Sequence, residues 1–181
     1  ITRLSLVSSR AWQRSNAHFQ KAVEAVHGGV IGKVTFAKTW NYANIYPEGI
    51  GNPPDSAPPA DLDWDLWLGP APKVPFNANR FGVVPNAFSH FRWFWDYAGG
   101  MMTDWGVHLI DIAQWAMNVE APLSVSAVGG KFNLTDNRET PDTILASYQY
   151  PDFVMTYENR VCNGQAMNGK NYGLEFYGTE G

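Results

Sequence analysis

The sequence has few of the features on which several protein classes depend. Cys162 is the only cysteine among 181 residues, which excludes an internal disulfide and a cysteine-based metal cluster. No apolar run approaches the roughly 20 residues that a membrane-spanning helix needs. No block of lysine and arginine occurs, and the net charge is −4 at pH 7. We therefore expect no nucleic acid and no membrane among the partners.

What is present is the composition of a globular protein. Hydrophobic residues make up 45% of the chain and charged residues 17%, and the length permits a sizeable core. The chain begins in a strand-like run, "ITRLSLVSS", and ends in "LEFYGTEG". We expect residues 1–181 to form a single α+β domain cut from a longer protein on its N-terminal side and at its C-terminal end. The single cysteine is compatible with a reducing compartment, and we expect a cytoplasmic protein.

Hydrophobic periodicity and turn signals predict the secondary structure. Residues 2–9 form a strand, Ser15 is the N-cap of a helix that Gly28 ends, and residues 32–42 form the next strand. The stretch 43–98 holds nine of the 12 prolines, is expected to be irregular, and contains a short aromatic turn in "LDWDLWLGPAP".

A helix and four strand-like runs complete the expected elements. The helix follows residue 98, and the strands cover 122–132, 143–150, 153–161 and 171–177, with a tight turn at "YPDF" (150–153). This order predicts an α+β fold with an open, largely antiparallel mixed sheet and helices on one face. The uncovered sheet face has apolar content, so we expect it to form a homo-oligomer contact.

The motif "GGMMTDWGVHLIDIAQW" (99–115) places Asp104, His108 and Asp111 at i, i+4 and i+7, on one helix stripe. Asp104 is expected in the first turn, where the helix dipole stabilises a carboxylate. A neighbouring carboxylate orients an imidazole and raises its proton affinity, which suits a general acid/base. Asp111 would orient the ring from the other side. A structural Asp–His pair and an Asp/His/Asp metal site are the alternatives, the latter with fewer ligands than stable sites use; we expect no metal.

Aromatic and basic residues precede this motif. The run 91–97 is "FRWFWDY", and stacked rings such as that of Trp93 suit sugar faces, although packing of the long loop is the simpler explanation for most of them. Arg80 and Arg92 are candidates for contact with a polar or acidic sugar. Either arginine could instead pair with Asp96 or Glu48.

Several segments, taken in order, resemble one protein family. They are "SSRAWQRSNAHFQKAVEAVHGGVIGKVTFAKTW", "LDWDLWLGPAPKVPFNANRF" and "RWFWDYA" followed by "GGMMTDWGVHLID". Together they resemble the C-terminal substrate domain of the Gfo/Idh/MocA family of NAD(P)-dependent sugar and polyol oxidoreductases. The resemblance covers most of the chain.

The resemblance implies a two-domain enzyme. Members carry an N-terminal Rossmann domain with a Gly-rich fingerprint and an E-K-P lysine, and neither motif occurs here. It therefore implies that NAD or NADP is bound mainly by a domain outside this chain, so that the fragment alone binds the dinucleotide poorly and is inactive. His108 would take the hydroxyl proton as hydride leaves the carbon, and Asp104 would orient substrate or imidazole. Asp111, Arg14, Trp93 and Arg92 would contact substrate or support the site.

Two functions remain open from the sequence. The first is the catalytic domain of an oxidoreductase that acts on a small sugar or polyol. The second is a carbohydrate-binding or oligomerisation module that has lost its chemistry. A third reaction, glycoside cleavage through transient oxidation, is less favoured because the motif that we associate with it differs from "TDWGVH".

Overall fold

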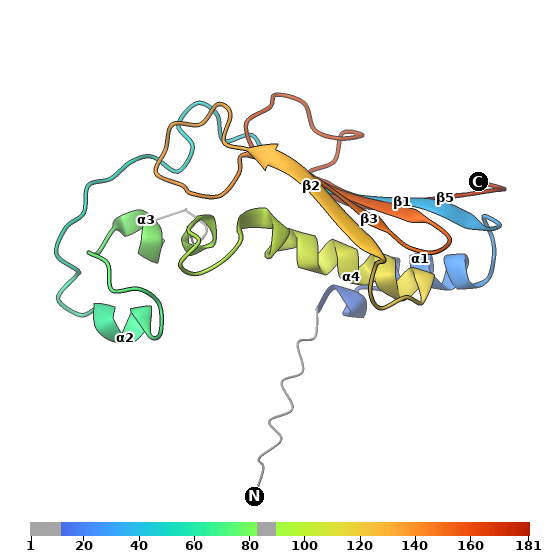
Figure 1. Ribbon diagram of the computed structural model, residues 1–181, viewed down its shortest axis with the longest axis horizontal. Helices are drawn as coiled ribbons and strands as arrows, with labels where there is room; N and C mark the ends of the chain where they lie inside the picture. The colour runs from blue at the N-terminus through green and yellow to red at the C-terminus, as the bar shows by residue number, and fades with distance from the viewer. Residues whose placement is uncertain (1–11, 83–89) are drawn as a thin grey trace, which may run out of the picture.

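The computed structural model describes residues 12–82 and 90–181 (Figure 1). Five strands form one sheet: β1 (Val34–Tyr42), β2 (Ser124–Gly130), β3 (Thr143–Gln149), β4 (Val154–Arg160) and β5 (Tyr172–Gly178). The helices are α1 (Ala17–His27), α2 (Trp64–Leu68), α3 (Ala78–Phe81) and α4 (Trp105–Met117), with 3₁₀ turns η1 (Trp12–Ser15), η2 (Phe91–Trp93) and η3 (Gly100–Met102). The strand expected at 2–9 lies outside the described residues.

The sheet is mixed and mostly antiparallel, in the order β2-β3-β4-β1-β5. Only β1 and β4 run parallel, with Ala37 opposite Met155, while the other neighbouring strands are antiparallel. The turn predicted at 150–153 joins β3 to β4, and the backbone N–H of Tyr150 donates to the carbonyl of Phe153 at 3.0 Å. The predicted α+β fold is confirmed.

Helices α1 and α4 cover one face of the sheet (Figure 1). Their buried side chains form a core with β4, made of Phe19, Val23, Leu109, Ile112, Ala116 and Tyr157. Gly106 brings the start of α4 close to the sheet, because a Cβ at this position would lie 3.2 Å from the ring of Tyr157. The Tyr157 hydroxyl donates to the carbonyl of Met101 at 2.9 Å, and burial raises its pKa far above the ordinary value. The sheet thereby fixes the N-terminal end of α4.

The start of α1 differs from the prediction. Ser15 ends η1, and Asn16 rather than Ser15 stands at the N-cap position with an extended backbone. The side chain of Asn16 donates to the Gln13 side chain at 2.6 Å instead of capping the helix. The prediction of Ser15 as N-cap was therefore wrong by one residue. Ser15 belongs to the 3₁₀ turn that precedes the helix.

The described parts of the long stretch, residues 43–82 and 90–98, contain short helices and aromatic contacts. The "LDWDLWL" segment forms α2, and the Asp63 carboxylate caps it by accepting the Leu66 N–H at 2.9 Å. Trp64 stacks on Trp67 with ring centroids 4.6 Å apart, and Trp67 meets Tyr97 edge-to-face at 5.0 Å. As Figure 1 shows, α2 and α3 lie beyond the N-terminal end of α4. No helix among residues 12–82 and 90–181 is long and apolar enough to cross a membrane.

The face of the sheet opposite the helices exposes apolar side chains. Leu145, Val154 and Tyr177 are 44%, 41% and 45% exposed, and Val128 beside Leu145 is 68% exposed. Strand pairing places these residues on the face opposite Tyr157 and Met155, so α1 and α4 do not cover them. The arrangement fits the expectation that this face contacts another copy.

We expect the protein that carries this chain to self-associate through this face. Light scattering at high protein concentration should give a dimer or larger species. Val154→Glu should shift the population toward monomer, because it introduces a charge into the contact. Val30→Glu is the matched control, since Val30 is 69% exposed but lies in the turn after α1. A wild-type protein that stays monomeric at all concentrations would contradict the expectation.

Candidate functional site

The start of α4 is set by two glycines and a threonine. Gly100 has a φ of +66°, and a Cβ there would lie 2.9 Å from the Thr140 side chain. The N–H of Gly99 donates to the Thr103 hydroxyl at 2.8 Å. Asp104 then occupies the N-cap position of α4, and its side chain makes no capping hydrogen bond. Asp104 therefore stands one residue before the first turn in which the sequence placed it.

The Asp104 carboxylate forms a close ion pair with the Arg92 guanidinium. Arg92 belongs to η2 and is 6% exposed, while the Asp104 side chain is 24% exposed. Burial lowers the pKa of Arg92 from its ordinary value, but an arginine remains charged at neutral pH. The sequence offered two roles for Arg92, contact with a sugar and pairing with an acid. The structure shows Arg92 paired with an acid, which is Asp104 rather than Asp96 or Glu48.

The Asp111 carboxylate is held by Arg14. Arg14 Nε donates to Asp111 Oδ2 at 2.7 Å, and Nη2 donates to Oδ1 at 2.5 Å, so the pair is bidentate. The hydrogen bond to Asp111 raises the pKa of Arg14. The guanidinium also lies over the Trp115 ring, 5.3 Å from its centroid. These contacts tie η1 to α4 across 97 positions of sequence.

His108 lies between these ion pairs on the same helix stripe, half-buried. Its Nδ1 atom is buried and has no hydrogen-bond partner among residues 12–82 and 90–181. The imidazole meets the rings of Trp12 and Trp105 edge-to-face, with centroids 6.5 Å away in each case. The predicted stripe is present, but each carboxylate is paired with an arginine from another element, and in the described residues neither is hydrogen-bonded to His108. The expected direct Asp–His contact was therefore wrong.

The other predicted site residues are placed as follows. Trp93 is 5% exposed and packs in a core cluster with Phe94, Leu134 and Val161, so its ring offers little surface to a ligand. Arg80 is paired with Asp96 at 2.6 Å and with Glu139 at 3.1 Å. The structure thus brings Arg14 of η1 to Asp111 and Arg92 of η2 to Asp104, with His108 between them along α4, and leaves Trp93 in the core.

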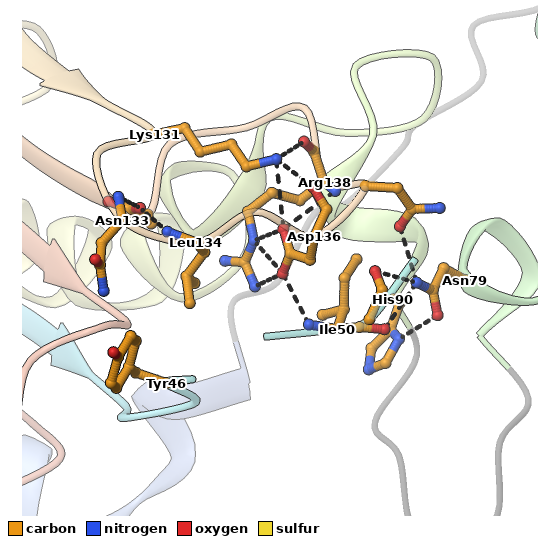
Figure 2. A network of polar contacts seen from close by, with 12 residues as sticks. Tyr46, Ile50, Asn79, His90, Lys131, Asn133, Leu134, Asp136 and Arg138 are labelled. Atoms are coloured by element: carbon orange, nitrogen blue, oxygen red, sulfur yellow. Dashed lines mark hydrogen bonds and ion pairs between the residues drawn. The ribbon is translucent and has the colours of Figure 1, made fainter. Parts of the chain in front are cut away.

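Sequence reasoning missed a buried polar network that holds the loops beside the site (Figure 2). Asp136 accepts hydrogen bonds from Arg138 Nε and Nη2 at 2.9 and 2.8 Å, and from the Ile50 N–H at 2.8 Å. Both charged side chains are 0% exposed. The Arg138 guanidinium lies 4.4 Å from the centroid of the Trp93 ring, so the network supports the turn that carries Arg92. The only sequence signal was a charged pair in a loop, which resembles any solvated turn.

The described residues contain no group of three or more His, Cys, Asp or Glu side chains that could hold a metal ion. The Asp/His/Asp stripe itself does not converge, because arginines occupy both carboxylates. A Gly-rich dinucleotide fingerprint is absent from the sequence. The chemically active group of the site is the imidazole of His108. Exposed aromatic and apolar side chains lie beside it, including Trp12 at 64% and Val107 at 50% exposure.

Comparison with solved structures shows the fold. GenD2 from gentamicin A biosynthesis, solved in complex with NAD, matches with a TM-score of 0.58 and 16% identity over 94% of this chain and 37% of that chain. The WlbA dehydrogenase from Bordetella pertussis, solved with NADH and UDP-GlcNAcA, matches with a TM-score of 0.59 and 16% identity over 94% and 40%. A putative myo-inositol dehydrogenase from Sinorhizobium meliloti gives 0.54 and 17% over 95% and 39%.

The chain therefore spans less than half the length of these solved chains. The comparison with curated proteins finds no match. A family model described as "Oxidoreductase family, C-terminal alpha/beta domain" matches residues 16–169, which is most of the chain. The chain belongs to the Gfo/Idh/MocA oxidoreductase family, of which it is a C-terminal α/β domain.

Proposed function

We propose that this chain is the substrate-binding and catalytic domain of a nicotinamide-dependent oxidoreductase that oxidises a CH–OH carbon of a sugar or polyol. The observation that carries the proposal is the imidazole of His108. It is half-buried between two ion pairs, and its buried Nδ1 has no partner in the described chain. Buried polar atoms in proteins nearly always have a partner, so an orphan atom on a titratable ring marks a candidate for chemistry.

Oxidation of an alcohol removes a proton from oxygen and a hydride from carbon. His108 is the proposed base for the proton, because a neutral imidazole nitrogen can accept a proton and the ring is only half-buried. Nicotinamide, when bound, supplies the hydride acceptor. Base and hydride acceptor must meet the same carbon centre, so the surface around His108 is where the dinucleotide-binding part would pack.

The two ion pairs favour an uncharged substrate. Asp104 and Asp111 are each balanced by an arginine, so the two carboxylates on the stripe of His108 add no net charge beside it. A polyhydroxylated neutral molecule fits that environment, with hydroxyls for the paired groups and carbon faces for Trp12 and Trp105. The putative myo-inositol dehydrogenase is named for a neutral polyol of this kind, whereas WlbA was solved with UDP-GlcNAcA, a sugar that carries charged groups.

The cofactor in this proposal is NAD or NADP, bound mainly by a separate dinucleotide-binding domain. Two observations support a separate cofactor domain. The sequence has no Gly-rich fingerprint, and the chain matches only 37% of the length of GenD2. GenD2 and WlbA were solved with NAD and NADH. The exposed side chains of Trp12 and Val107 beside His108 provide apolar surface against which a second domain can pack.

The test is turnover by the full-length protein that carries this chain. A panel of aldoses, cyclic polyols and linear polyols is offered with NAD⁺ and with NADP⁺, and nicotinamide reduction is followed by absorbance. We expect reduction with at least one of these substrate classes. Sugar binding measured by calorimetry without any reduction would favour a non-catalytic carbohydrate-binding module instead.

A further inference from the structure

We infer that the pocket between α2 and the segment Phe91–Tyr97 binds a second sugar ring, so that the substrate is a glycoside or oligosaccharide. The inference rests on the proposed function and narrows its substrate class. The pocket has a volume of about 490 Å³, within the usual range for small-molecule sites. Trp67, Pro70 and Pro72 form one wall, and Phe91, Asp96 and Tyr97 form the other.

The rings of this pocket can contact the carbon faces of a sugar. Phe91 is 36% exposed, and Trp67 and Tyr97 are each half-buried at the pocket wall. The Trp67 ring is fixed in place because it stacks on Trp64 and contacts Phe81, whose ring centroid is 5.7 Å away. Aromatic rings fixed in this way offer apolar area at little entropic cost on binding.

The polar groups of the pocket are also fixed before a ligand arrives. Arg80 Nη1 donates to Asp96 Oδ2 at 2.6 Å and to the Tyr97 hydroxyl at 3.3 Å, while Nη2 donates to Glu139 at 3.1 Å. The guanidinium lies over the Phe94 ring, 4.6 Å from its centroid. A carboxylate accepts about four hydrogen bonds, so Asp96 retains acceptor capacity for sugar hydroxyls. The Tyr97 O–H, which accepts from Arg80, can itself donate to a sugar oxygen.

The pocket is linked to the proposed catalytic site through η2. Phe91 at its rim is followed by Arg92, whose guanidinium lies 5.7 Å from the centroid of the Phe91 ring and pairs with Asp104 at the start of α4. In Figure 1, α2 lies beyond the N-terminal end of α4, where a substrate that reaches past His108 would extend. Apolar ring faces combined with a fixed carboxylate and hydroxyl match a pyranose better than a purely apolar ligand.

The test compares cellobiose and maltose with glucose in the full-length protein. We expect kcat/KM to be higher for at least one disaccharide than for glucose. Phe91→Ala should lower the ratio of disaccharide to glucose kcat/KM by about 3–10-fold, the usual worth of one aromatic contact. Phe91→Tyr should restore most of the ratio. Leu66→Ala is the matched control, because Leu66 neighbours Trp67, is 77% exposed and does not line the pocket.

Calorimetric titration of cellobiose and maltose separates this inference from the proposed function. If no sugar is oxidised but Phe91→Ala still weakens disaccharide binding, the pocket inference stands and the catalytic proposal fails. If sugars are oxidised but Phe91→Ala leaves the disaccharide-to-glucose ratio and the disaccharide affinity unchanged, the pocket inference is overturned and the catalytic proposal stands.

Discussion

Replacing His108 by alanine is expected to lower kcat of the proposed oxidation by the full-length protein by roughly 10²–10⁴-fold, the usual contribution of a general base. The proton of the substrate hydroxyl then has no acceptor on α4, because Asp104 and Asp111 are occupied by Arg92 and Arg14. The substitution breaks no hydrogen bond at Nδ1, since that atom has no partner in the described residues. The melting temperature should therefore change much less than the rate.

His27→Ala is the matched control for this prediction. His27 is an exposed histidine at the end of α1, and its Nε2 lies 3.2 Å from the carbonyl of Trp115 on the same α4. Its removal should change kcat by less than about twofold, as for most surface substitutions. A His108→Ala enzyme that reduces nicotinamide at the wild-type rate on every substrate of the wild type would show that His108 is structural.

Asp104→Asn separates positioning from proton transfer. Asp104 contacts Arg92 rather than His108, so its loss should lower kcat less than His108→Ala does. In the double variant the two effects should not add, because a rate already limited by the missing base depends little on the position of its neighbours. Full additivity of the two effects in ΔΔG‡ would indicate that they act independently.

The largest expected loss of stability comes from Asp136→Asn. The side chains of Asp136 and Arg138 are 0% exposed, and removing one charge of a buried pair typically costs about 3–5 kcal/mol of unfolding free energy. The substitution also weakens the acceptor of the Ile50 N–H, which ties the 45–51 turn to the 131–138 loop (Figure 2). Denaturant unfolding followed by circular dichroism measures the effect.

The same carboxylate predicts a pH dependence. Burial opposes ionisation of Asp136, but the hydrogen bonds from Arg138 and from the Ile50 N–H outweigh it and hold the pKa below its ordinary value. The stabilisation from this lowered pKa is present above the pKa of an unfolded aspartate, about 4, and is lost as the pH falls through the folded value. Asp136→Asn should remove part of this acid-induced loss.

Asp152→Asn is the control for both measurements. Asp152 pairs with Lys33 in an ion pair whose side chains are 73% and 64% exposed, so its loss should cost less than about 1 kcal/mol. If Asp136→Asn were no more destabilising than Asp152→Asn, the buried network would not hold these loops in place.

The fold could be predicted because its signals are local. Alternation in the four C-terminal strands and the tight turn at 150–153 predicted the ends of β2 to β5 to within two residues. The parallel pairing of β1 with β4 was not predictable in this way, because it depends on contacts between residues more than 100 positions apart, such as Ala37 and Met155.

The candidate site shows the same division. The helical stripe of Asp104, His108 and Asp111 follows from spacing alone, and the structure retains it. The partners of both carboxylates lie outside the motif, Arg92 in η2 shortly before it and Arg14 in η1 97 positions before Asp111, so the motif alone could not predict the arginine pairs. Trp93 was predicted to contact substrate but lies in the core. The sequence around a tryptophan beside a site motif does not show whether its ring faces a ligand or the core.

In the proposed reaction, this chain supplies the base for hydride transfer from a sugar or polyol carbon to nicotinamide. The most direct measurement uses a substrate of the full-length protein deuterated at its CH–OH carbon, with analysis of the nicotinamide product by NMR. Deuterium should appear on the nicotinamide ring with the wild-type protein, and at a rate lower by roughly 10²–10⁴-fold with His108→Ala. Transfer of deuterium at an equal rate by both proteins, or no transfer by the wild type from any sugar or polyol, would contradict the proposal.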